Sequence, residues 1–206
     1  MNTLNATSFY KIFEQSVADY HVHDDINQPM ENPYPEKSLD FLLYKKNWID
    51  TVQWHYEDLI REPNIDPVEG MKLKRLIDKS NQERTDLVEQ IDEIIYNKYV
   101  NVEKLPGAGW NTESPAWAID RLSILALKIY HMHQETIRKD AGAGHIAKCS
   151  EKLNILLQQK ADLIASINEL FADLEAGRKY MKVYKQMKMY NDEALNPVLY
   201  KQKQQD

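Results

Sequence analysis

Basic side chains interrupt otherwise apolar helix stripes, and these residues have the clearest capacity for chemistry in the sequence. A charge buried without a partner costs several kcal/mol, so each of them must be paired, reach solvent, or meet a ligand. Counting inward from the ends of the predicted helices places four of them at about one level of the fold: Lys45, Arg84, Lys128 and Lys160. Such a group predicts either internal ion pairs or recognition of a phosphate or carboxylate.

Both explanations have named candidates in the sequence. The acids available for internal pairing are Asp120, Asp86 and Glu83. The candidate ligand-binding residues are Lys45, Arg84, Asp120, Arg121, Lys128, His131 and Lys160. His131 and Asp120 are of types that act as acid and base, but eleven residues separate them on one helix, about 16 Å along its axis. No catalytic residue is assigned, and whether the protein is an enzyme stays open.

Histidines and acids also occur in groups, but their local spacing argues against a metal centre. One group lies in a Pro- and Asn-rich connector, which favours a solvated linker: His21, His23, Asp24 and Asp25. His131 and His133 point about 200° apart on a helix, and His55 and Glu57 have the same fault. No Glu-x-x-His occurs, which excludes the di-iron site of helical bundles, and no phosphate-loop or Gly-x-Ser-x-Gly motif is found. The sequence therefore predicts no metal and no cofactor.

The helix that must position most of these residues runs from Ser114 to His133. Ser114 followed by Pro115 is a strong helix-start signal, because the hydroxyl can cap the helix and proline lacks an N–H to satisfy. Apolar residues then occur at every angle around the helix, which is typical of a buried element. Polar residues on such a helix need partners, so any specificity of the protein is expected to involve it.

Other segments predict a bundle around this central helix. Apolar residues at helical spacing predict a short helix over 8–20, and long helices over 38–61 and 66–99. The last long helix is predicted from residue 146 through 187, with Gly177 bending it and Asn196-Pro197 ending it. No segment alternates with period two, so no strand is expected. The prediction is an all-α, antiparallel up-down bundle of four long helices, with the short N-terminal helix packed on its side.

A single domain spans the chain in this prediction. Residues 1–37 form the N-terminal helix and connector, residues 38–192 the bundle, and residues 193–206 a tail. Near the end of the bundle, five cations occur without an intervening acid: Arg178, Lys179, Lys182, Lys185 and Lys188. As an amphipathic helix, this stretch would contact an anionic surface or present a solvated outer face with its aromatic residues packed inward.

Composition limits the classes of function. The chain has 206 residues and a net charge of −6, which gives no support for nucleic-acid binding. The single cysteine, Cys149, lies on an apolar stripe and is expected in the core. We expect a cytoplasmic protein, because neither a secretory signal nor a membrane span is apparent. The 4 Trp and 12 Tyr favour association, either as a homodimer or with a protein partner.

Several phrases resemble one protein family over nearly the whole chain. They are KKNWID (45–50), QWHYEDLIR (53–61), RLIDKSNQERTD (75–86), NTESP (111–115), IDRLSILALKIYHM (119–132) and YKQMKMYND (184–192). They look like a bacterial family catalogued as domain of unknown function 4254, which has no assigned activity or catalytic residues. Its relatives are often encoded near glycosyltransferase and lipopolysaccharide-assembly genes. The resemblance thus implies envelope glycan metabolism, and a phosphosugar or nucleotide-sugar as the anion; the alternative is a non-enzymatic interaction or scaffold bundle.

Overall fold

Six α-helices make up the regular structure of the described residues. The structure is a computed structural model that describes residues 4–187, 189 and 193–202. The helices are α1 (Ala6–Tyr20), α2 (Leu39–Leu59), α3 (Pro67–Tyr99), α4 (Pro115–Thr136), α5 (Ala143–Glu175) and α6 (Pro197–Gln202). Within these ranges no strand forms, and a single isolated bridge pairs Gly109 with Lys179. The all-α prediction is confirmed.

Side-chain caps explain where most of the helices begin. The Asn5 side chain accepts from the amides of Thr7 and Ser8 at α1, and Ser38 accepts from Phe41 N at α2. At α3 the Asp66 side chain accepts from the amides of Val68 and Glu69, and Pro67 follows it. These contacts satisfy backbone donors that have no partner within the helix.

The central helix α4 begins differently from the prediction. Ser114 occupies the N-cap position but makes no side-chain cap hydrogen bond of its own. Instead, Asp92 of α3 accepts from the Ala116 amide at 3.0 Å and from the Ser114 hydroxyl. The cap of α4 is therefore a tertiary contact, which ties α3 to the start of the central helix.

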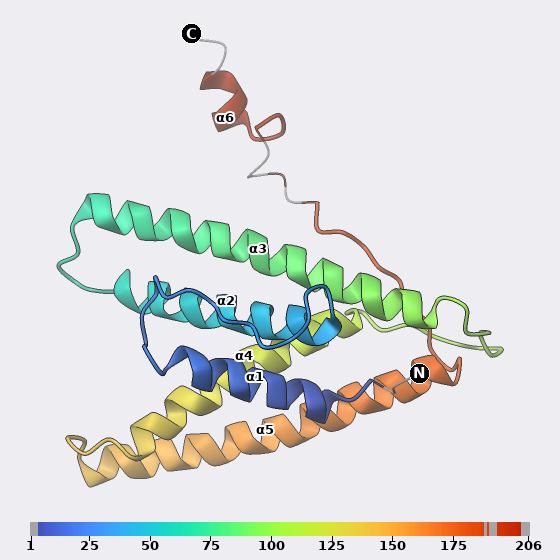
Figure 1. The fold of residues 1–206 in the computed structure, drawn as a ribbon, viewed down its shortest axis with the longest axis horizontal. Helices are drawn as coiled ribbons and strands as arrows, with labels where there is room; N and C mark the ends of the chain where they lie inside the picture. Colours follow the sequence, from blue (N-terminus) through green and yellow to red (C-terminus); the bar gives the residue numbers. More distant parts are fainter. Residues whose placement is uncertain (1–3, 188, 190–192, 203–206) are drawn as a thin grey trace.

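Two helical hairpins form the frame, and α1 lies between them (Figure 1). The α2–α3 hairpin and the α4–α5 hairpin meet through α4, and α1 packs against α2, α4 and α5. The α1 side chains Phe9 and Phe13 are buried, and Phe9 meets Phe171 of α5 edge-to-face with ring centroids 6.0 Å apart. The short helix is thus part of the core rather than packed on its side. A regular up-down bundle of the four long helices is not confirmed.

The end of α5 also differs from the prediction. The helix stops at Glu175, and Gly177 has a φ of 70°, in the left-handed region. Leu105 N donates to Gly177 O at 2.9 Å, and Tyr180 N donates to Gly109 O at 3.0 Å, so the chain after α5 runs along the loop that precedes α4. The prediction of a helix through residue 187 is therefore wrong. Of the predicted basic helix, Lys188 lies outside the described residues, and residues 178–187 are not helical.

Candidate functional site

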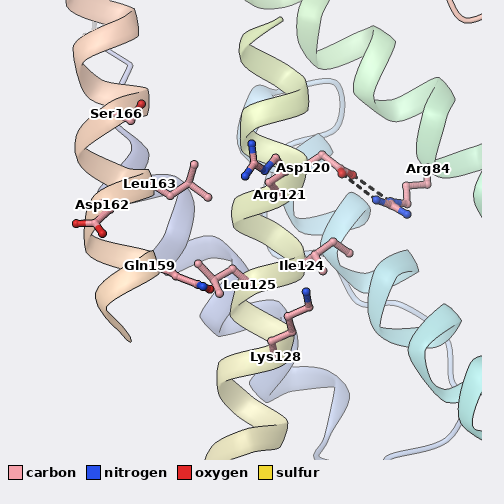
Figure 2. A pocket seen from close by; sticks show the side chains of 10 residues that line it. All are labelled: Arg84, Asp120, Arg121, Ile124, Leu125, Lys128, Gln159, Asp162, Leu163 and Ser166. Atoms are coloured by element: carbon pink, nitrogen blue, oxygen red, sulfur yellow. Dashed lines mark hydrogen bonds and ion pairs between the residues drawn. The ribbon is translucent and has the colours of Figure 1, made fainter. Parts of the chain in front are cut away.

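A buried ion cluster links α2, α3 and α4. Arg84 donates from Nε and Nη2 to the two carboxylate oxygens of Asp120, at 3.0 and 2.8 Å (Figure 2). The Nε atom of Arg84 is also 3.1 Å from Oδ1 of Asp50. Lys46 Nζ lies 2.7 Å from Asp120 Oδ1 and forms a second ion pair with Asp50. Two cations and two carboxylates therefore balance one another inside the protein.

The buried lysine is Lys46, not the predicted Lys45. Lys46 is only 1% exposed, whereas Lys45 is partly exposed and forms no ion pair with any residue that the structure describes. A shift of one residue on a helix rotates a side chain by about 100°, so the predicted stripe on α2 was placed to one side of the true contact face. The network continues past Lys46: Asn47 Nδ2 donates to Ser123 Oγ at 2.9 Å, and Ser123 Oγ donates to Asp50 Oδ2 at 2.7 Å.

The two carboxylates of the cluster differ in their pKa values. Burial raises the pKa of Asp50, against the opposing charges of Lys46 and Arg84. Burial also acts on Asp120, but Lys46 and Arg84 outweigh it and hold the pKa of Asp120 below its ordinary value. Asp120 is thus a fixed anion, which makes it an unsuitable proton donor or acceptor near neutral pH. The cluster is well suited to holding three helices in register.

An open groove runs over α4 between α5 and this ion cluster; we call it the α4–α5 groove. Its cavity has a volume of about 670 Å³. Figure 2 shows its lining: Arg84, Asp120, Arg121, Ile124, Leu125, Lys128, Gln159, Asp162, Leu163 and Ser166. Among the described residues Lys128 has no ion-pair partner, and Arg121 has only a loose one, Glu113 at 3.6 Å. The groove therefore offers two cations that are not tightly paired.

A second cavity of about 540 Å³ continues the α4–α5 groove toward the start of α4. The two cavities share Arg121, Leu163 and Ser166. The far end of the second cavity is formed by Trp110, which is 56% exposed, and by the polar residues around it: Asn111, Thr112, Glu113, Asp173 and Lys179. Lys182 Nζ lies 3.9 Å from the centre of a Trp110 ring, so the cation helps to hold the indole in place. One end of the groove is thus basic and the other aromatic and polar.

The structure separates the predicted site residues into three groups. Arg84, Asp120, Arg121 and Lys128 line the α4–α5 groove together. Lys45 and Lys160 do not line it, and Lys160 Nζ instead lies 4.7 Å from the centre of the Tyr10 ring on α1. His131 belongs to a different cluster about three turns further along α4, so the Asp120 and His131 pair has no common site.

Three histidines that the sequence analysis considered only in local groups converge in the structure, which the sequence did not predict. The imidazoles of His21, His55 and His131 offer nitrogen atoms that all lie within 4.8 Å of one another. Burial lowers the pKa of His21, and burial with the neighbouring His21 and His55 lowers the pKa of His131 to about 4. The three residues are far apart in the sequence, so no local spacing could have identified them.

A second group of possible metal ligands lies at the α4–α5 turn: Glu135, His145 and Cys149. Here the His145 Nε2 atom is already 2.7 Å from Glu135 Oε2 and 3.4 Å from Cys149 Sγ. Cys149 is buried, as expected from the sequence. Because the imidazole nitrogen already has a hydrogen-bond partner, this group is explained without a metal.

Together, the fold and these sites define an all-helical protein with a buried ion cluster and an open polar groove. The chain belongs to the family described as protein of unknown function (DUF4254), whose model matches residues 40–183. Comparison with curated proteins and with solved structures gave no significant match. In the described part of the chain, no helix has both the length and the apolar character needed to cross a bilayer.

Proposed function

We propose that this protein binds a small anionic ligand, a phosphosugar or nucleotide-sugar, in the α4–α5 groove. The observation that carries the proposal is the pair Arg121 and Lys128, which line a cavity of about 670 Å³. Lys128 has no ion-pair partner within the residues that the structure describes, and the nearest carboxylate oxygen to Arg121 in an ion pair is that of Glu113, at 3.6 Å. That volume is in the range of about 300–1,000 Å³ typical of small-molecule sites. The proposal places the protein in the cytoplasm, in glycan metabolism.

The basic end of the groove suits a phosphate or diphosphate group. Arg121 and Lys128 are seven residues apart on α4, so their Cα atoms lie about 10 Å apart along one side of the helix. Arginine and lysine side chains are long enough to converge on one group from that separation. Gln159 and Ser166 on α5 add neutral hydrogen-bonding groups across the groove. Arg84 contributes less, because Asp120 and Asp50 already neutralise it.

The other end of the groove suits a sugar or a base. Trp110 offers an exposed aromatic surface for stacking, and Asn111 and Glu113 offer polar atoms that can pair with hydroxyl groups. The sugar part of the proposal also rests on the association with glycan-assembly genes that the family resemblance implies. No catalytic step is proposed, because Asp120 is held by Arg84 and Lys46 and His131 lies outside the groove.

A thermal-shift screen of the full chain against phosphosugars, nucleotide-sugars and inorganic phosphate tests this function. A ligand present at 100 times its dissociation constant should stabilise the parent by about 2.7 kcal/mol. Lys128→Met should weaken binding roughly tenfold or more, since a hydrogen bond to a charged group is worth about 1.5–3 kcal/mol. Trp110→Ala should weaken binding of sugar-containing ligands but not of inorganic phosphate.

The matched control is Lys152→Met, which removes an exposed lysine on α5 outside the groove. Its ligand response should equal that of the parent. If no compound stabilises the parent, or Lys128→Met responds like Lys152→Met, the anion-binding proposal is wrong. The alternative, an interaction or scaffold protein whose ion cluster fixes helix register, would then be preferred.

A further inference from the structure

Three histidines from three helical segments converge on one point of the structure. His21 is the C-cap residue of α1, His55 lies near the end of α2, and His131 lies on α4. The Nε2 atoms of all three are buried and have no hydrogen-bond partner among the described residues. Buried polar atoms are rarely left without a partner, so three of them in one cluster of imidazoles require an explanation.

The protonation pattern of His21 is the one that a metal ligand needs. Its Nδ1 atom lies 2.6 Å from the carbonyl oxygen of Val17, a contact in which Nδ1 must carry the proton and donate it. The Nε2 atom then carries a lone pair, and it lies 3.9 Å from Asp24 Oδ1, the same oxygen that is 3.5 Å from Nε2 of His55. Metal-binding histidines commonly donate their second nitrogen to a carbonyl or carboxylate in this way.

Aromatic packing fixes the other two rings. His131 stacks on Trp54 with ring centroids 4.7 Å apart and planes 7° from parallel. His55 stacks on Tyr20 at 5.2 Å and 12°. Rings held in this way keep their nitrogen atoms in place, and a preformed set of ligands loses little entropy when an ion binds.

A carboxylate completes the group. Oδ1 of Asp24 is 3.5 Å from Nε2 of His55 and 3.9 Å from Nε2 of His21. Asp24 has a φ of 52°, a conformation uncommon for a residue other than glycine, and its amide donates to Tyr20 O at 3.1 Å. The Asp24 side chain is 58% exposed, so this side of the cluster is open to solvent. An ion can therefore enter from the connector between α1 and α2.

We propose that His21, His55 and His131, with Asp24, bind a divalent transition-metal ion such as Zn²⁺. Three imidazole nitrogens and one carboxylate suit Zn²⁺ and its neighbours in the first transition row, whereas Mg²⁺ and Ca²⁺ prefer oxygen ligands. With zinc–nitrogen bonds of about 2.0–2.1 Å, the nitrogens of a tetrahedral site lie about 3.4 Å apart. The side chains would thus draw together slightly from their present spacing. The ion would join α1, α2 and α4 at one point.

The site is independent of the α4–α5 groove, since none of its four residues lines that cavity. Metal binding and anion binding can therefore fail separately. The tertiary structure also brings together histidines that local spacing on one helix keeps apart. His131 and His133 cannot share an ion, nor can His55 and Glu57, but one member of each pair meets His21 in the fold.

Cobalt titration of the full chain, first stripped of metal with a chelator, provides the test. Tetrahedral Co²⁺ gives strong visible absorption bands, and Zn²⁺ should displace it at one equivalent. Removal of an outer-shell partner typically weakens metal binding about 10–100-fold, so loss of a direct ligand in His55→Ala or His131→Ala should weaken it by at least about 100-fold. Asp24→Asn, at an exposed position, should weaken binding with little risk to folding.

The chain supplies matched controls of the same residue type. His133→Ala changes an exposed histidine on α4, and His23→Ala changes one in the same connector as Asp24. Both should bind Co²⁺ like the parent, and circular dichroism should show that all compared variants are folded. The proposal is overturned if the parent takes up no Co²⁺, or if Asp24→Asn and the two ligand variants bind like these controls. It is also overturned if Cys149→Ser abolishes binding while His55→Ala retains it, because the ion would then lie at the α4–α5 turn.

Discussion

At the scale of single residues, Arg84 is expected to have a large effect on stability. Its guanidinium bridges Asp120 of α4 and Asp50 of α2, both of which are buried. Replacing it leaves two carboxylates opposite a single lysine, Lys46. A buried ion pair is costly to form, but breaking one by removing a partner is more costly still, because the remaining charge has no compensation.

We therefore expect Arg84→Ala to lower the free energy of unfolding by about 3–5 kcal/mol. Urea denaturation followed by circular dichroism measures this directly. Arg75→Ala is the control, because Arg75 is exposed on the same helix and its loss should change stability by less than about 0.5 kcal/mol. Equal midpoints for the two variants would show that Arg84 does not hold the cluster together.

At the scale of elements, the end of α5 is determined by one glycine. Gly177 adopts a φ of 70°, and a Cβ atom placed there would lie 2.1 Å from the carbonyl oxygen of Glu103. The pattern Tyr180, Val183 and Tyr184 continues helical spacing beyond this point, which is why the sequence predicted a longer helix. The backbone requirement at Gly177 overrides that pattern, because the left-handed conformation ends a helix.

We expect Gly177→Ala to destabilise the protein by more than the roughly 1–2 kcal/mol that the left-handed conformation alone costs an alanine, because the clash with Glu103 adds to it. Thermal unfolding should show a clearly lower midpoint. In contrast, Gly144→Ala should be neutral or stabilising, since its φ is not in the left-handed region and nothing lies within 4 Å of the added atom. A Gly177→Ala midpoint equal to that of the parent would contradict the observed end of α5.

At the scale of the whole molecule, α1 holds the two hairpins together. The sequence suggested an accessory helix, but its apolar face is enclosed by α2, α4 and α5. Phe13 is 0% exposed, and Tyr20 near the helix end is equally buried. The position of α1 also brings His21 to His55 and His131, so the proposed metal site depends on this packing.

Phe13→Ala should accordingly cost about 3–5 kcal/mol, the usual result of emptying a phenylalanine site in a core. An accessory helix packed on the outside would give a much smaller loss, or a separate early transition. Val22→Ala, two residues past α1 at a position 73% exposed, serves as the control and should leave the unfolding midpoint unchanged. Chemical denaturation monitored by both circular dichroism and tryptophan fluorescence distinguishes these outcomes, because an integral α1 predicts coincident transitions.

The sequence by itself determined the helical class of this protein and most helix starts. Helix periodicity and caps such as Ser38 and Asp66 act within a few residues of the chain, so they can be recognised without a fold. The same local period correctly placed Arg84 on the inner side of α3 and made Asp120 a candidate partner. The groove residues Arg121 and Lys128 were likewise among the candidates, because both lie on the central helix.

Only the tertiary structure decided how these elements meet. The position of α1 depends on how the two hairpins pack against each other. The burial of Lys46 instead of Lys45 depends on the rotation of α2 about its own axis, by about 100° relative to the predicted stripe. The α4 cap comes from Asp92 on another helix, and the convergence of His21, His55 and His131 joins three distant segments. Periodicity gives the face of each helix but neither its rotation nor its neighbours, because those are set by side chains that pack across the whole core.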